Sequence, residues 1–273
     1  MEAYGDFASV YDTFMDETPY EEWCQFVEEV ITEYGISKPG EAEGNEVLAS
    51  ERNLVLDLGC GTGTLTEMLA AKGYDMVGID LSREMLAIAM DKKAENGSET
   101  LYLCQDMREL ELYSTVGTVI SVCDSVNYLL EEEEILQTFK LVNNYLYPGG
   151  IFLFDFNTVY KYEQVIGDTT IAENREDCSF IWENFYNPEN QQNEYDLTIF
   201  VKDETFETQE PCFRRFQETH VQRGYTLEQM ERLIKQAGMK LEFAMDADTH
   251  GDVTEESERI YILAREIQKN ERI

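Results

Sequence analysis

Short apolar runs and longer amphipathic stretches alternate along the middle of the chain. The apolar runs predict buried β-strands at residues 54–58, 75–80, 101–104, 118–123 and 151–156. The stretches between them predict helices at residues 64–72, 82–96 and 132–146. Ser82 is a suitable helix cap, and Gly73 and the Pro148-Gly149-Gly150 turn follow helix ends. This alternation predicts a mainly parallel sheet with helices on both faces.

The pattern changes towards both ends of the chain. Residues 19–35 predict an amphipathic helix, and the polar, glycine-containing stretch 37–50 predicts a flexible loop. Near the C-terminus a helix is predicted at residues 226–237, with two further strands at 240–244 and 259–265. Together with the five central strands, these give a doubly wound, mostly parallel sheet of seven strands.

The helical rhythm is lost between residues 158 and 223. Short strand-like runs at 180–182, 197–201 and 213–216 have no long helices between them. We therefore predict a small antiparallel β insertion at 158–223, serving as a substrate or lid subdomain. The main domain would comprise residues 1–157 plus 224–273.

Composition narrows the class of protein. No apolar run among the 273 residues approaches the roughly 20 residues that a membrane helix requires. The acidic, polar start of the chain does not resemble a secretory signal, so a soluble cytoplasmic protein is expected. The six cysteines form no CxxC pair, which favours buried free thiols in a reducing compartment. With only two histidines, a histidine-rich metal site is excluded and no metal is predicted.

The charge balance is strongly acidic, with 21 Lys and Arg against 56 Asp and Glu and a net charge of −35. Such a surface repels nucleic acid. The acidity either serves solubility or attracts a cationic or amine substrate, and the sequence leaves both interpretations open.

A glycine-rich turn between the first predicted strand and helix is the strongest chemical signal. Gly59, Gly61 and Gly63 allow a ligand to approach the backbone at a helix N-terminus. The dinucleotide fingerprint G-x-G-x-x-G would need a glycine where Thr64 stands. Asp57, at the strand end, would repel a pyrophosphate but suits a ligand ammonium group.

The segment DLGCGTG, residues 57–63, resembles the first motif of class I S-adenosylmethionine-dependent methyltransferases. The resemblance implies a Rossmann-like fold and S-adenosylmethionine as cofactor. It implies that Asp80, at the end of the second strand, meets the ribose, and that Asp106 accepts from the adenine amino group with Met107 packed nearby. By the same resemblance, the cofactor-binding residues are expected to be Tyr4, Tyr11, Asp57, Gly59, Cys60, Gly61, Asp80, Leu81, Asp106, Met107 and Cys123.

Two more segments extend the resemblance. Cys123 and Asp124 end the fourth predicted strand, a region that lies near the sulfonium in related enzymes; Asp124 either orients an amine or water, or caps a turn. The opening Tyr4-Gly5-Asp6-Phe7-Ala8-Ser9-Val10-Tyr11-Asp12 is similar to the "FAxxYD" start of small bacterial methyltransferases. There the N-terminal segment folds over the cofactor, so Tyr4 and Tyr11 either approach its methionine end or anchor the segment to the core.

Methyl transfer from sulfur is an in-line displacement that mainly requires alignment and exclusion of water. A base is needed only if the acceptor must lose a proton early. His220 is a candidate base, with a plain surface histidine as the alternative interpretation. Asp124 and Tyr11 are the other candidate catalytic residues, whereas Arg214, Arg215 and Arg223 either bind a substrate carboxylate or pair with acids.

The sequence therefore predicts an S-adenosylmethionine-dependent methyltransferase acting on a small-molecule or amine-type acceptor. The alternatives are a methyltransferase-fold protein that binds cofactor without turnover, and a nicotinamide-dependent oxidoreductase. No nucleic-acid or membrane partner is predicted. The acceptor and the oligomeric state are not readable from the chain.

Overall fold

Seven strands form the main sheet of the computed structural model, which describes residues 7–40, 46–203 and 211–269. Their spatial order is β10-β11-β5-β4-β1-β2-β3. Their bounds are β1 Val55–Leu58, β2 Met76–Asp80, β3 Leu101–Cys104, β4 Val116–Ser121, β5 Leu146–Asn157, β10 Met239–Asp246 and β11 Arg259–Glu266. Only β11 runs against its neighbours, β5 and β10, while β3, β2, β1, β4 and β5 are parallel. The predicted fold class is confirmed.

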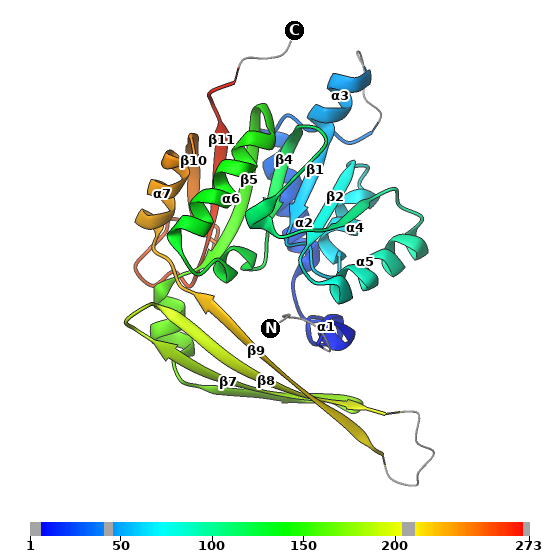
Figure 1. Cartoon of the computed structure of the whole chain (residues 1–273), viewed down its shortest axis with the longest axis vertical. Coiled ribbons are helices and arrows are strands. Elements are labelled where there is room, and N and C mark those ends of the chain that lie inside the picture. Colours follow the sequence, from blue (N-terminus) through cyan, green and yellow to red (C-terminus); the bar gives the residue numbers. More distant parts are fainter. Residues whose placement is uncertain (1–6, 41–45, 204–210, 270–273) are drawn as a thin grey trace.

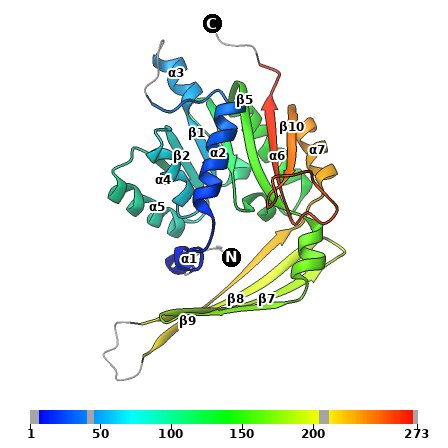
Figure 2. The same cartoon turned by 180° about the vertical axis from the view of Figure 1, so that it is seen from behind.

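Helices cover both faces of this sheet (Figure 1, Figure 2). On one face α6 (Glu132–Tyr145) and α7 (Leu227–Gln236) enclose a core that includes Phe139, Phe152 and Phe154. On the other face α2 (Tyr20–Tyr34) and α4 (Thr64–Ala71) bury Val27, Ile31 and Leu69 against the strands. Helix α5 (Arg83–Asn96) packs beside α4 and β3, and Ser82 caps it by accepting the Met85 N–H.

A second, four-stranded antiparallel sheet projects from the main body like an arm (Figure 1). Its strands are β6 Thr170–Asn174, β7 Cys178–Asn187, β8 Gln192–Lys202 and β9 Phe213–Arg223. A short π-helical segment, η3 (Lys161–Ile166), connects β5 to the arm. Helix α1 (Ala8–Phe14) lies between the arm and the main body (Figure 1, Figure 2), where Val10 packs on Leu197 and Ile199.

The structure corrects several expectations about elements. The second half of the predicted loop 37–50 is wrong, because α3 (Glu46–Asn53) is helical and EVLASERN contains strong helix formers. Strand β6 was not predicted, and β7, β8 and β9 are much longer than the apolar runs that signalled them. Polar residues alternate with apolar ones along these strands and interrupt the apolar runs, and some of them, including Asn193, His220 and Gln222, are buried.

None of the helices formed by the described residues is long and apolar enough to span a membrane. Within the same ranges, no group of three or more His, Cys, Asp and Glu side chains is arranged to hold a metal. All six cysteines are free thiols, and Cys24 and Cys178 are buried as expected; Cys104 is exposed, contrary to expectation, because β3 is an edge strand.

Candidate functional site

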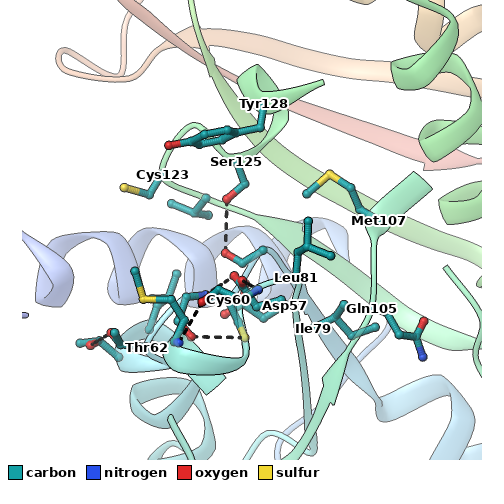
Figure 3. Close-up of a pocket in the computed structure, with 18 of the residues that line it drawn as sticks. Asp57, Cys60, Thr62, Ile79, Leu81, Gln105, Met107, Cys123, Ser125 and Tyr128 are labelled. Carbon is teal, nitrogen blue, oxygen red and sulfur yellow. Dashed lines mark hydrogen bonds between the residues drawn. The ribbon is translucent and has the colours of Figure 1, made fainter. Parts of the chain in front are cut away.

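A cavity of about 390 Å³ opens at the carboxyl ends of β1, β2, β3 and β4. Ligand sites in open α/β sheets lie at this edge. The glycine turn forms its floor, and the 3₁₀ helix η2 (Ser125–Tyr128) stands over it (Figure 3). A second 3₁₀ helix, η1 (Met107–Glu109), contributes Met107 to the wall (Figure 3). The volume lies within the roughly 300–1,000 Å³ usual for small-molecule sites.

The glycine turn has the geometry that its sequence predicts. Gly59, Gly61 and Gly63 all have positive φ, at 82°, 54° and 73°. The N–H groups of Gly59 and Cys60 donate to the Ile79 carbonyl at 2.7 and 2.9 Å, which ties the turn to β2. A Cβ on Gly59 would lie 2.6 Å from the Ser125 hydroxyl oxygen, so η2 can approach only because residue 59 is glycine.

Asp57 presents a buried carboxyl group to the cavity. Its Oδ2 accepts a hydrogen bond from the Thr66 hydroxyl at 2.5 Å. Burial, with a smaller contribution from the nearby charge of Asp80, raises the pKa of Asp57 to about 7 against the opposing effect of the Thr66 hydrogen bond. A positively charged group placed beside this carboxyl would favour its ionised form.

Asp80 and Asp106 occupy the ends of the next two strands. The two oxygens of Asp80 accept the Gly61 and Ser82 N–H groups, each at 2.8 Å, and burial raises the Asp80 pKa. Each oxygen retains capacity for another donor. Asp106 is held by Arg108, whose Nη2 donates to it at 2.6 Å and whose hydrogen bonds lower the Asp106 pKa. Leu81, 64% exposed, adds an apolar side chain to the wall.

The turn after β4 has an unusual backbone. Cys123 and Asp124 have φ values of 70° and 53°, in the left-handed region that non-glycine residues seldom adopt. The strand ends at Ser121, two residues before the predicted end. Cys123 lines the cavity, and burial raises the pKa of its thiol to about 12, so the thiol is protonated at neutral pH.

The side chain of Asp124 contacts β5 and β9 and does not line the cavity. Its Oδ2 accepts from Gln222 at 2.7 Å and from Asn157 at 3.1 Å. Asp124 is the N-cap residue of η2 in a left-handed turn conformation, and its carbonyl accepts the Asn127 N–H at 2.9 Å, but its side chain makes no capping hydrogen bond. Its observed contacts instead fix the turn between the main sheet and the arm.

His220 is 2% exposed, so the interpretation as a surface histidine is wrong. In β9 it pairs with Tyr195 of β8 and stacks on the Tyr195 ring at 4.9 Å. Its Nδ1 lies 3.2 Å from the Tyr128 hydroxyl oxygen and its Nε2 lies 3.2 Å from Glu218 Oε2. Tyr128 itself lines the cavity.

Comparison with known proteins identifies the family of this chain. Residues 55–150, from β1 to the start of the turn within β5, match the model of a methyltransferase domain. The putative methyltransferase YqeM of Bacillus subtilis is 35% identical over 96% of both chains. A crystal structure of an S-adenosylmethionine-dependent methyltransferase from Clostridium acetobutylicum has a TM-score of 0.81 and 29% identity, covering 97% of this chain and 100% of the other. This chain belongs to the class I S-adenosylmethionine-dependent methyltransferases.

A third relative matches a shorter part of the methyltransferase. The dTDP-3-amino-3,4,6-trideoxy-α-D-glucopyranose N,N-dimethyltransferase of Streptomyces venezuelae is 34% identical over 101 residues, 37% of this chain and 41% of the relative. Family membership decides against the nicotinamide-dependent oxidoreductase, in keeping with Thr64 in place of a third dinucleotide glycine.

The three arginines considered for a substrate carboxylate are engaged elsewhere in this methyltransferase. Arg223 donates to the Leu130 carbonyl at 2.8 Å, and Arg214 pairs with Asp203 at 3.0 Å. Arg215 donates to Gln217 at 3.2 Å. None of these three arginines lines the cavity.

Aromatic residues were only partly predicted. Tyr11 of α1 lines the methyltransferase cavity, whereas Tyr4 lies outside the described residues. Sequence reasoning missed Tyr20 and Trp23 at the start of α2, and Tyr128 in η2. The apolar face of α2 was visible in the sequence, but nothing there indicated that its first turn reaches a ligand site.

Proposed function

We propose that the cavity binds S-adenosylmethionine and that the enzyme methylates a small amine-bearing molecule. One observation carries the cofactor assignment: Asp57 and Asp80, at the ends of neighbouring strands β1 and β2, both face one cavity of ligand size. A buried acid suits an ammonium group, and an acid that keeps acceptor capacity suits paired ribose hydroxyls.

The remaining lining residues fit the other parts of the ligand. Asp57 would hold the methionine ammonium and Asp80 the ribose, beside the backbone of Gly59, Cys60 and Gly61. Leu81 and Met107 would enclose the adenine, with Asp106 near its amino group.

Tyr11 and Cys123 would lie at the sulfonium end of the ligand. The position of α1 supports assignment to the small bacterial enzymes with an "FAxxYD" opening, whose N-terminal segment covers the cofactor. In that assignment Tyr4 is expected at the methionine end as well.

An amine acceptor is supported by charge and by one relative. The net charge of −35 attracts cations, and the Streptomyces relative is named as acting on an amino sugar. We assign the acceptor side to residues 158–223, because β9 packs on η2 at the cavity edge. S-adenosylmethionine would supply a methyl group activated by positive sulfur, while the protein aligns the acceptor and excludes water. Asp124 would act by positioning the turn that carries η2.

Calorimetric titration tests the cofactor assignment. We expect S-adenosylmethionine to bind and NAD not to bind, with Asp80→Asn weakening binding and the exposed Asp91→Asn leaving it unchanged. A panel of alkylamines and amino sugars, read out as S-adenosylhomocysteine, tests turnover. Tight NAD binding without S-adenosylmethionine binding would overturn the proposal.

A further inference from the structure

A chain of three polar side chains leads from the cavity wall into the arm. Tyr128, which lines the cavity beside Cys123 and Ser125 (Figure 3), lies within hydrogen-bond distance of His220 Nδ1 at 3.2 Å. The opposite ring nitrogen, Nε2, lies 3.2 Å from Glu218 Oε2. The hydroxyl of Tyr195 is also 2.9 Å from that of Tyr128. The order from the cavity inward is therefore Tyr128, His220, Glu218.

The polar side chains behind Tyr128 are largely buried. His220 and Tyr195 are both buried, and the Glu218 side chain is 10% exposed. Buried polar groups are costly unless their hydrogen bonds are satisfied, so a connected polar network at this junction calls for a role beyond packing.

The backbone that carries Tyr128 is held in a sparsely populated conformation. Cys123 and Asp124 have positive φ, and such strain persists only where surrounding contacts enforce it, commonly at functional sites. Here the Asp124 N–H donates to Asp155 at 3.0 Å, and its carboxylate accepts from Gln222 and Asn157. These contacts fix η2 between β5 and β9, and so fix Tyr128 against His220.

Glu218 also connects His220 to the N-terminal segment. Its Oε1 accepts the Phe7 N–H at 3.0 Å, while Oε2 faces His220. Since α1 follows Phe7 directly and supplies Tyr11 to the cavity, one carboxylate joins the segment beside the cofactor site to the histidine.

We infer that Tyr128, His220 and Glu218 form a proton relay that deprotonates the methyl acceptor. The inference rests on the proposed function, because it requires an acceptor beside the cofactor cavity. Glu218 holds His220 as the Nε2–H tautomer, so the Nδ1 lone pair accepts from the Tyr128 hydroxyl. The phenolic oxygen can then accept a hydrogen bond from the acceptor.

The proton balance follows from amine chemistry. An alkylamine with a pKa near 10 arrives as an ammonium ion and has no lone pair for attack. One ammonium N–H bond breaks and its proton joins the Tyr128 oxygen, while the Tyr128 proton moves to His220 Nδ1. The resulting imidazolium is stabilised by Glu218. The freed nitrogen lone pair then forms the N–CH₃ bond, the C–S bond breaks with its electron pair on sulfur, and His220 later returns its proton to solvent.

Nitrogen NMR of the full-length protein labelled with ¹⁵N-histidine tests the arrangement without an acceptor. The protein has two histidines, so His220→Gln assigns both signals. We expect His220 in the Nε2–H tautomer, with Tyr128→Phe changing the Nδ1 signal and Glu218→Gln changing the Nε2 signal. His250, exposed on the other side of the sheet, should not respond. A protonated Nδ1 in neutral His220, or no response to Tyr128→Phe, overturns the relay.

The pH profile of turnover tests its role. The groups in contact with His220 include Glu218 of β9, Tyr128 of η2 and Tyr195 of β8. The relay requires a neutral His220 imidazole, so kcat should fall towards acidic pH. We expect His220→Gln and Tyr128→Phe each to lower kcat on the amine panel roughly 100-fold, within the range of general-base effects, and to remove this acidic limb.

Binding of S-adenosylmethionine should remain as in the wild type in His220→Gln, because His220 does not line the cavity. The controls His250→Gln and Tyr113→Phe should match the wild type throughout. Unchanged kcat and pH profile in His220→Gln would overturn the relay while leaving the proposed function intact. If the wild-type protein does not bind S-adenosylmethionine, the proposed function itself is refuted.

Discussion

At the scale of single residues, Asp57 gives the cofactor pocket a measurable pH dependence. Burial raises its pKa to about 7, so below that pH the free protein carries a proton that an incoming ammonium group would displace. We expect S-adenosylmethionine affinity to rise as pH increases from 6 towards 7, by up to about tenfold per unit, and to level off above pH 7. Calorimetry in buffers of different ionisation enthalpy measures the released proton directly.

Asp57→Asn provides the matching loss of function. Removing the charge should weaken binding by about 1–3 kcal/mol at pH 8 and flatten its dependence on pH. The exposed Asp91→Asn should keep both properties of the wild type. An Asp57→Asn variant with wild-type affinity and an unchanged pH slope would mean that the ammonium lies elsewhere.

The glycines of the turn differ in what a methyl group would meet. Gly61→Ala places Cβ where no described heavy atom lies within 4 Å, so only the left-handed φ is unfavourable, by roughly 1–2 kcal/mol. Gly59→Ala adds a clash with Ser125 at 2.6 Å, which should cost about another 1–3 kcal/mol. Urea unfolding midpoints should therefore fall in the order wild type, Gly61→Ala, Gly59→Ala; the reverse order for the two variants would contradict this account.

Sequence reasoning at this scale succeeded where the signal is local. The turn at 57–63, Asp80 at the end of β2 and Asp106 after β3 are contiguous with their strands. Both of these acids and most residues of the turn line the cavity. His220 and Tyr128 are 92 positions apart and meet only because β9 returns alongside η2. No spacing rule within the chain shows that pairing, so the sequence leaves His220 open between a candidate base and a surface residue.

At the scale of elements, α1 is joined to the glycine turn by a small polar cluster. Asp12 accepts from the Thr62 hydroxyl at 2.7 Å and pairs with Lys92 of α5 at 2.7 Å, while Lys92 also donates to Thr64 at 2.6 Å. The cluster is partly exposed, so its contribution to global stability is expected to be small.

Lys92→Met should therefore loosen α1 without unfolding the protein. We expect the free energy of unfolding to change by less than about 1 kcal/mol. Amide hydrogen exchange of residues 8–14 should nevertheless become faster. Without the Lys92–Asp12 ion pair, local opening of α1 costs less free energy. Lys72→Met, which removes a comparable pair with Glu28 on α2, is the control and should leave α1 unchanged. Equal exchange of α1 in both variants would show that the apolar contacts of Val10 hold it alone.

The sequence predicted elements best where burial is two-sided. The central strands β1, β2, β4 and β5 were predicted because buried parallel strands are nearly continuously apolar, whereas the edge strand β3 was predicted from its short apolar run although it is partly exposed. Helix α1 was not predicted as a helix because seven residues give too little periodicity, and β6 was missed because most of its side chains are exposed. Elements stabilised by their neighbours rather than by their own pattern need the tertiary structure to be recognised.

At the scale of the whole molecule, the contacts between the arm and the main body and the net charge both affect the stability of the fold. The arm meets the main body through η2, η3 and α1, so the site depends on contacts between parts far apart in sequence. Both parts belong to a chain with a net charge of −35, and that charge repels itself in the compact state. Screening should therefore stabilise the fold.

We expect Tm to rise when ionic strength increases from 10 to 150 mM, since the screening length shortens from about 30 to about 8 Å. Sodium chloride and choline chloride should act alike, because the effect depends on ionic strength and not on a bound cation. The same change should weaken S-adenosylmethionine binding, because the positively charged ligand loses long-range attraction to the acidic protein while its buried contact with Asp57 is little screened. A Tm that is flat or falls with both salts would mean that ion pairs, such as that between Arg175 and Asp16 across α1 and the arm, outweigh the repulsion of the excess acids.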